Sequence, residues 1–127
     1  MRNYTRKLAK GTQAGIDVVA LKQRLYLAED MMIIDVRDEM SVRANAVILP
    51  RARWIPFSLL RDRLPELPLD KPIVVYCDCP EDQAAVVTSE LLRQSGGKDV
   101  RPLVGGLQAW IKQGWSTIEL KLEMLPA

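Results

Sequence analysis

Short apolar runs rich in β-branched residues alternate along this chain with segments of helical periodicity. Met32 to Val36 and Ile73 to Cys77 have the composition of buried strands. The segment Val18 to Leu27 instead repeats its apolar residues at the spacing of one helix face. This alternation predicts the α/β class, with a mostly parallel sheet covered by helices on both faces. Ligand sites in such sheets lie at the carboxyl ends of the strands.

The other expected elements continue the alternation. We expect Ser58 to cap a helix over Leu59 to Leu67, which Pro65 ends or distorts. The rest, in chain order, are a strand around Arg53 to Ile55, a helix from Gln83 to Gln94 closed by Gly96-Gly97, a strand from Val100 to Leu103, and a last helix through Trp110 that stops near Gly114.

The chain of 127 residues is long enough for one core and too short for two. We expect a basic, solvated and partly disordered lead-in over residues 1–14, one domain over 15–118 and a tail over 119–127. Its longest apolar runs are far short of the ~20 residues that a transmembrane helix needs. It also lacks the apolar region of a secretory signal.

Composition excludes several classes of function. A net charge of +2 is no footprint for nucleic acid. Two cysteines separated by one residue make no disulfide framework, which favours a reducing, cytoplasmic location. Two thiols do not fill a tetrahedral zinc site, so we expect no metal, and nothing in the sequence calls for a cofactor. The chain has no histidine, which excludes an imidazole base.

Cys77 is the leading candidate for a reactive residue. It ends an expected buried strand, and a helix begins a few residues later at Gln83. Unpaired N–H groups in a first helical turn, with the positive end of the helix dipole, favour a thiolate. The alternative is a small buried residue that only ends a core strand.

Four ordered landmarks in the sequence resemble those of a rhodanese domain, over roughly Ile16 to Trp115. They are Ile34 to Arg37, Pro50 to Ala52 with Ile55-Pro56, Val74 to Cys77, and Gly105 to Trp110 with Gly114. The resemblance implies a three-layer α/β/α fold around a five-stranded, mostly parallel sheet. It also implies that Cys77 accepts a sulfane sulfur as a persulfide, donated by a small molecule or a protein, and passes it to a thiol acceptor.

The loop after Cys77 departs from the family pattern. Rhodaneses that use thiosulfate commonly carry a cation there, whereas this loop is acidic and Pro80 removes one N–H from it. The acidic Cys-x-Cys-Pro form resembles rhodanese domains attached to bacterial membrane proteins, so a cytosolic part of a larger membrane-associated assembly is one interpretation. The loop residues considered for the site are Asp78, Cys79, Pro80, Glu81, Asp82 and Gln83.

Several roles stay open at this point. Cys79 either resolves or relays the sulfur on Cys77 or simply occupies the loop. The three carboxylates either face Cys77 or cap the following helix. Asp35 and Arg37 are expected to form structural hydrogen bonds or an ion pair beside the sheet. Gly105 and Gly106 are expected to let one backbone approach another near the loop.

Three functions therefore compete. The first is a sulfurtransferase or sulfur carrier that uses Cys77, with thiosulfate as a poor donor. The second is a non-catalytic binding or regulatory module with the same fold. The third is a redox switch formed by Cys77 and Cys79. The sequence does not determine the donor, the acceptor or the oligomeric state.

Overall fold

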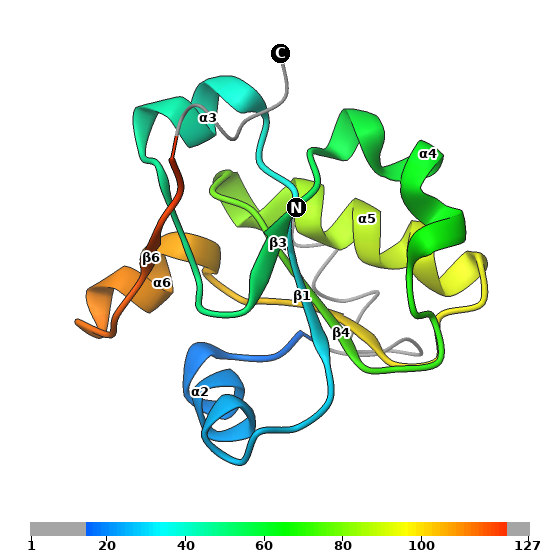
Figure 1. Cartoon of the computed structure of the whole chain (residues 1–127), viewed down its shortest axis with the longest axis horizontal. Coiled ribbons are helices and arrows are strands. Elements are labelled where there is room, and N and C mark those ends of the chain that lie inside the picture. The colour runs from blue at the N-terminus through cyan, green and yellow to red at the C-terminus, as the bar shows by residue number, and fades with distance from the viewer. Residues whose placement is uncertain (1–14, 122–127) are drawn as a thin grey trace.

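Four parallel strands form the centre of the protein, described by a computed structural model over residues 15–121 (Figure 1). The strand order is β3-β1-β4-β5, so the two apolar runs that stand out in the sequence occupy the middle of the sheet. Central strands are buried on both faces, which is why these runs are continuously apolar. The bounds are β1 (Met32–Asp35), β3 (Ala52–Trp54), β4 (Ile73–Tyr76) and β5 (Val100–Pro102).

Side chains of the central strands alternate between two hydrophobic cores. In β4, Ile73 and Val75 belong to one core, and Val74 and Tyr76 belong to the other. The first core is covered by α4 (Leu60–Arg63) and α5 (Gln83–Gln94) and the second by α2 (Val18–Tyr26) and α6 (Gly106–Lys112), on opposite faces of the sheet (Figure 1). The predicted three-layer α/β/α fold is confirmed.

Within residues 15–121 the main sheet has four strands rather than the predicted five. At its β5 edge, Ile16 forms an isolated parallel bridge with Leu103. Ile16 N–H donates to the Pro102 carbonyl at 2.9 Å, and Val104 N–H donates to the Ile16 carbonyl at 2.8 Å. Pairing stops there within the described residues because Asp17 is already the N-cap of α2 and accepts from Ala20 N–H.

A small antiparallel ribbon and a short helix have no counterpart in the sequence analysis. Strand β2 (Val47–Ile48) pairs with β6 (Ile118–Glu119), and both are too short for a clear alternating pattern. Helix α3 (Glu39–Ala44) lies between β1 and β2, and Asp38 caps it by accepting from Ser41 N–H at 2.8 Å.

The predicted helix over Leu59 to Leu67 is wrong in its start and its continuity. The chain forms a 3-10 turn η1 (Phe57–Leu59), then α4, then a second 3-10 turn η2 (Leu64–Glu66). Ser58 lies inside η1 and makes no capping hydrogen bond. Pro65 has no N–H to donate, which accounts for the distortion expected at this position.

The predicted lead-in over residues 1–14 lies outside the described residues, as do residues 122–127. Between them, no helix in residues 15–121 is long and apolar enough to cross a membrane.

Candidate active site

Cys77 lies directly after β4, at the carboxyl end of the central strand. Its side chain belongs to the core beneath α5, and only 2% of its surface is exposed. The neighbouring strand β1 ends beside it, because Val36 N–H donates to the Tyr76 carbonyl at 3.0 Å. The thiol position predicted from the sequence is therefore at the strand edge where α/β folds bind ligands.

The start of α6 fixes the backbone of Cys77. The Cys77 carbonyl accepts from Leu107 N–H at 3.2 Å, and Gly106 packs against the same carbonyl with φ of 55°. A Cβ atom at Gly106 would overlap that oxygen. The close approach expected of the glycine pair is thus made by Gly106, whereas Gly105 uses its N–H to bind Asp82 Oδ2 at 3.0 Å.

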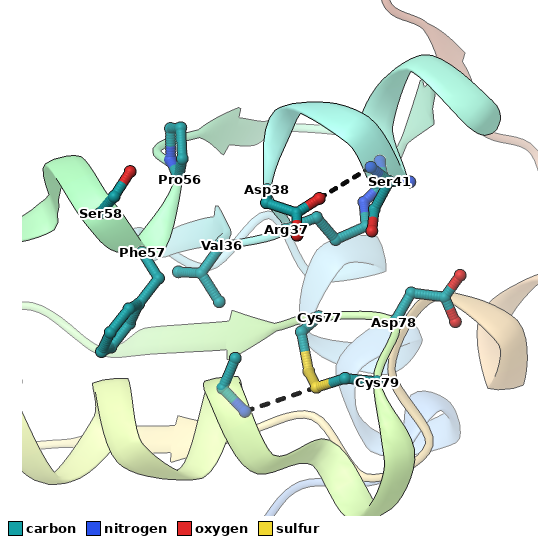
Figure 2. A pocket seen from close by; sticks show the side chains of 11 residues that line it. Val36, Arg37, Asp38, Ser41, Pro56, Phe57, Ser58, Cys77, Asp78 and Cys79 are labelled. Atoms are coloured by element: carbon teal, nitrogen blue, oxygen red, sulfur yellow. Dashed lines mark hydrogen bonds between the residues drawn. A yellow bond between two sulfur atoms is a disulfide. The ribbon is translucent and has the colours of Figure 1, made fainter.

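The sulfur atoms of Cys77 and Cys79 are joined in a disulfide, with Cα atoms 5.8 Å apart (Figure 2). Two backbone amides of the loop and helix point to Cys79. Ala84 N–H, in the first turn of α5, donates to Cys79 Sγ at 3.4 Å. Asp82 N–H donates to the Cys79 carbonyl at 3.1 Å. Both cysteines are therefore held by hydrogen bonds from the start of a helix, Cys77 by α6 and Cys79 by α5.

Two of the loop carboxylates are bound to the α6 region. Asp78 Oδ2 accepts from the Gln108 side chain at 3.2 Å and points away from the disulfide (Figure 2), while Asp82 accepts from Gly105. Asp82 is the N-cap of α5 by position but makes no capping bond with its side chain. The expectation that these carboxylates cap the following helix is wrong for Asp78 and Asp82. Glu81 is exposed.

The loop backbone is held in a conformation that most residues avoid. Glu81 and Asp82 have φ of 53° and 57°, in the left-handed region, where a non-glycine residue costs about 1–2 kcal/mol. The turn η3 (Pro80–Asp82) leads into Gln83, the first residue of α5. Partial burial raises the pKa of the Asp82 carboxyl above its ordinary value, and the Gly105 N–H bond opposes this effect.

Asp35 and Arg37 form the ion pair expected beside the sheet. Arg37 is 3% exposed and Asp35 0%, with 2.8 Å between the guanidinium and Asp35 Oδ2. The guanidinium also donates to the carbonyls of Asn45 at 2.9 Å and Val47 at 2.7 Å. Removing one partner of a buried pair typically costs about 3–5 kcal/mol. Arg37 thus holds the segment between β1 and β2 in place, and its positive charge is neutralised by Asp35.

Tyr76 carries a buried titratable group on the other face of β4. Its hydroxyl accepts from Leu49 N–H at 3.1 Å. Burial, with the nearby Asp35 carboxylate as a smaller cause, raises the pKa of Tyr76 well above its ordinary value. It remains a neutral phenol and belongs to the core beneath α2 and α6.

A pocket of about 290 Å³ opens beside the disulfide (Figure 2). Most of its lining residues were not predicted. Except for Ala84 in α5, they follow the carboxyl ends of β1 and β3, which is where parallel sheets bind ligands. The newly found residues are Val36, Asp38, Ser41, Pro56, Phe57, Ser58 and Ala84, beside the predicted Arg37, Cys77, Asp78 and Cys79.

The described residues contain no group of three or more Cys, Asp or Glu side chains placed to hold a metal ion.

A family model described as "Rhodanese-like domain" matches residues 17–113. A protein of Allochromatium vinosum named "Sulfurtransferase" is 31% identical over 99 residues, covering 78% of this chain and 89% of that protein. A protein of Coxiella burnetii named "Thiosulfate sulfurtransferase GlpE" is 32% identical over 90 residues, covering 68% and 77%.

Solved structures show the same architecture. The crystal structure of the Alr3790 protein from Anabaena has a TM-score of 0.73 and 32% sequence identity, covering 85% of this chain and 95% of that chain. The BH2092 protein from Bacillus halodurans has a TM-score of 0.74 and 26% identity, covering 93% and 82%.

Gly106→Ala is expected to destabilise the protein more than Gly114→Ala. Both glycines have positive φ, so both changes carry the strain of about 1–2 kcal/mol, but only the first places a Cβ against the Cys77 carbonyl. The overlap should lower the free energy of unfolding of Gly106→Ala by a further ~1–3 kcal/mol. Urea unfolding of both variants measures the difference, and equal free energies of unfolding would contradict the close approach.

Asp82→Asn is expected to stabilise the protein at neutral pH. The raised pKa means that the native state binds this proton more tightly than the unfolded chain. The ionised carboxylate therefore lowers stability above the native pKa, and this cost disappears as the pH falls through the native pKa toward the unfolded value. Asparagine keeps an oxygen for Gly105 and tolerates the left-handed φ.

The readout is the difference in urea midpoint between Asp82→Asn and wild type at neutral and at mildly acidic pH. The advantage of the variant should shrink on acidification. A difference that stays constant with pH would show that ionisation of Asp82 is not its cause.

Proposed function

The chain belongs to the rhodanese-like domain family, and we propose that it is a sulfurtransferase or sulfur carrier in which Cys77 accepts a sulfane sulfur as a persulfide. The observation that carries the proposal is the position of Cys77, at the end of β4 and in the lining of the pocket. Relatives named "Sulfurtransferase" and "Thiosulfate sulfurtransferase GlpE" support the reaction class.

The proposed reaction has two half-reactions. With the Cys77–Cys79 disulfide reduced, the Cys77 thiolate attacks the outer sulfur of a persulfide donor, and the donor leaves as its thiolate. A thiol acceptor then attacks the outer sulfur on Cys77, takes it as a new persulfide and restores the Cys77 thiolate. Sulfur moves at the same oxidation level in both steps, so no cofactor is needed.

The pocket supports a neutral or protein-bound persulfide donor. Val36, Pro56 and Phe57 give it apolar walls, and the acidic residues Asp38 and Asp78 also line it, with the Asp78 carboxylate pointing away from the disulfide. Of the lining residues between 15 and 121, the one cation is Arg37, which is already paired with Asp35. A carboxylate about 4 Å from a unit negative charge repels it by about 1–4 kcal/mol. Thiosulfate is a dianion, so we propose that it is a poor donor.

A second candidate function is a dithiol switch that opens and closes under cellular redox control. The Cys77–Cys79 disulfide favours it. A switch does not require that Cys77 carry sulfur, whereas the sulfurtransferase does, so the two candidates differ in one measurable property.

The test is intact-mass spectrometry of the reduced protein after exposure to a neutral low-molecular-weight persulfide. In wild type, Cys79 could remove the added sulfur by forming the disulfide with Cys77. The masses are therefore compared between the single variant Cys79→Ser and the double variant Cys77→Ser/Cys79→Ser. A gain of one sulfur atom in the first variant, reversed by added thiol and missing in the second, is the expected result. No gain in Cys79→Ser would reject the sulfurtransferase and leave the switch or a non-catalytic module.

Thiosulfate use should rise when the pocket loses a carboxylate. Asp78→Asn keeps an oxygen for Gln108 and removes one negative charge from the site. Its rate of sulfur uptake from thiosulfate should rise by at most about fivefold, equivalent to ~1 kcal/mol, because the Asp78 carboxylate points away from the disulfide. Glu81→Gln is the matched control, since Glu81 lies in the same loop but does not line the pocket.

The measurement is the initial rate of sulfur uptake from thiosulfate at low and high ionic strength. Wild type should be slow at low salt and improve as salt screens the carboxylates. Equal rates with thiosulfate and with a neutral persulfide, independent of salt, would contradict the proposed donor class.

A further inference from the structure

Cys79 makes more contacts in the site than a residue that only fills a position in the loop would need. Its sulfur lies within bonding reach of the Cys77 sulfur, and its carbonyl is fixed by Asp82 N–H. Its sulfur also accepts a hydrogen bond from Ala84 N–H. These are three separate contacts, and two of them involve the sulfur atom.

The Ala84 contact favours a thiolate at Cys79. Ala84 lies in the first turn of α5, a helix of 12 residues, where an N–H group and the positive end of the dipole stabilise negative charge. Within residues 15–121, Cys77 Sγ has no corresponding hydrogen bond. Cys79 is also half-buried, whereas Cys77 is 2% exposed. In the reduced protein, Cys79 is therefore the better stabilised thiolate.

The same geometry disfavours a long-lived persulfide on Cys77. The outer sulfur of a persulfide carries negative charge, and a rhodanese loop stabilises it with backbone N–H groups. Here Asp82 N–H and Ala84 N–H both bind Cys79, and Pro80 has no N–H. Among the described residues that line the pocket, two are acidic and the single cation, Arg37, is paired with Asp35.

We propose that Cys79 discharges the persulfide on Cys77 and releases its outer sulfur as hydrogen sulfide. The Cys79 thiolate attacks Cys77 Sγ, the bond between that sulfur and the outer sulfur breaks, and the Cys77–Cys79 disulfide forms. The electron pair of the broken bond leaves with hydrosulfide, so the outer sulfur is reduced and the two cysteines are oxidised. This inference rests on the proposed function, because Cys77 must first carry the sulfur.

The site of attack separates this reaction from a simple relay. Attack on the outer sulfur would move the persulfide to Cys79 and leave the disulfide unmade. Attack on Cys77 Sγ produces the bond that the structure contains. A dithiol reductant then reduces the disulfide and completes the cycle. The substrates are thus a persulfide and a dithiol, and the products are hydrogen sulfide, the thiol of the donor and the disulfide of the reductant.

The experiment is a single turnover of the full chain with a neutral hydroxyalkyl persulfide and no added reductant. Free sulfide is measured, and intact mass is recorded after thiol alkylation. Wild type should release one sulfide per chain and lose two hydrogen atoms without becoming alkylated. Cys79→Ser should retain one extra sulfur on Cys77 and release sulfide at least about tenfold more slowly, because it has lost the intramolecular nucleophile.

The outcomes separate this proposal from the one on which it rests. A persulfide that is equally stable in wild type and in Cys79→Ser, or that maps to Cys79, would overturn the discharge reaction and leave the sulfurtransferase intact. Failure of folded Cys79→Ser to gain sulfur would reject both. If the variant does not fold, wild type alone tests the proposal. Release of sulfide together with disulfide formation supports it, and a wild-type chain that keeps the added sulfur contradicts it.

Discussion

The contact between the Gly105-Gly106 turn and the Cys77 carbonyl is the constraint on which the site depends. Only glycine fits at Gly106, and the approach lets Leu107 N–H fix the end of β4. It also places Gly105 N–H against Asp82 and the Gln108 side chain against Asp78. The turn therefore both anchors the reactive backbone and binds two carboxylates that would otherwise be free to face the sulfur.

The two cysteines are consequently held by different helices. The start of α6 binds the Cys77 backbone, and the start of α5 binds the Cys79 sulfur. One cysteine is deeply buried at the strand end, and the sulfur of the other accepts a hydrogen bond from the first turn of α5. That division of roles is what the proposed carrier and its proposed resolving partner require, and it would make an acidic loop compatible with the proposed sulfur chemistry.

The sequence was enough to predict the layers, the central strands and the position of Cys77, because buried parallel strands and a long helix leave strong periodic patterns. It was not enough for β2, β6 and α3, which are too short for a pattern, or for the fifth strand, which is reduced to Ile16. The orientation of Asp78 and Asp82 depends on α6, more than twenty residues away, and helix capping is a local rule that misses such contacts. Phe57 and Asp38 lie in other loops than Cys77 and were not predicted, although β1 and β3 end at the same edge of the sheet as β4.

The central claim is that Cys77 holds the sulfane sulfur inside the pocket beside Val36 and Phe57. The most direct measurement is a crystal structure of Cys79→Ser after exposure to a neutral persulfide, since this variant cannot close the disulfide. The expected result is an additional sulfur bonded to Cys77 Sγ and directed into the pocket, with Gly106 still packed on the Cys77 carbonyl. An unmodified Cys77 in a protein whose fold is otherwise unchanged would contradict it.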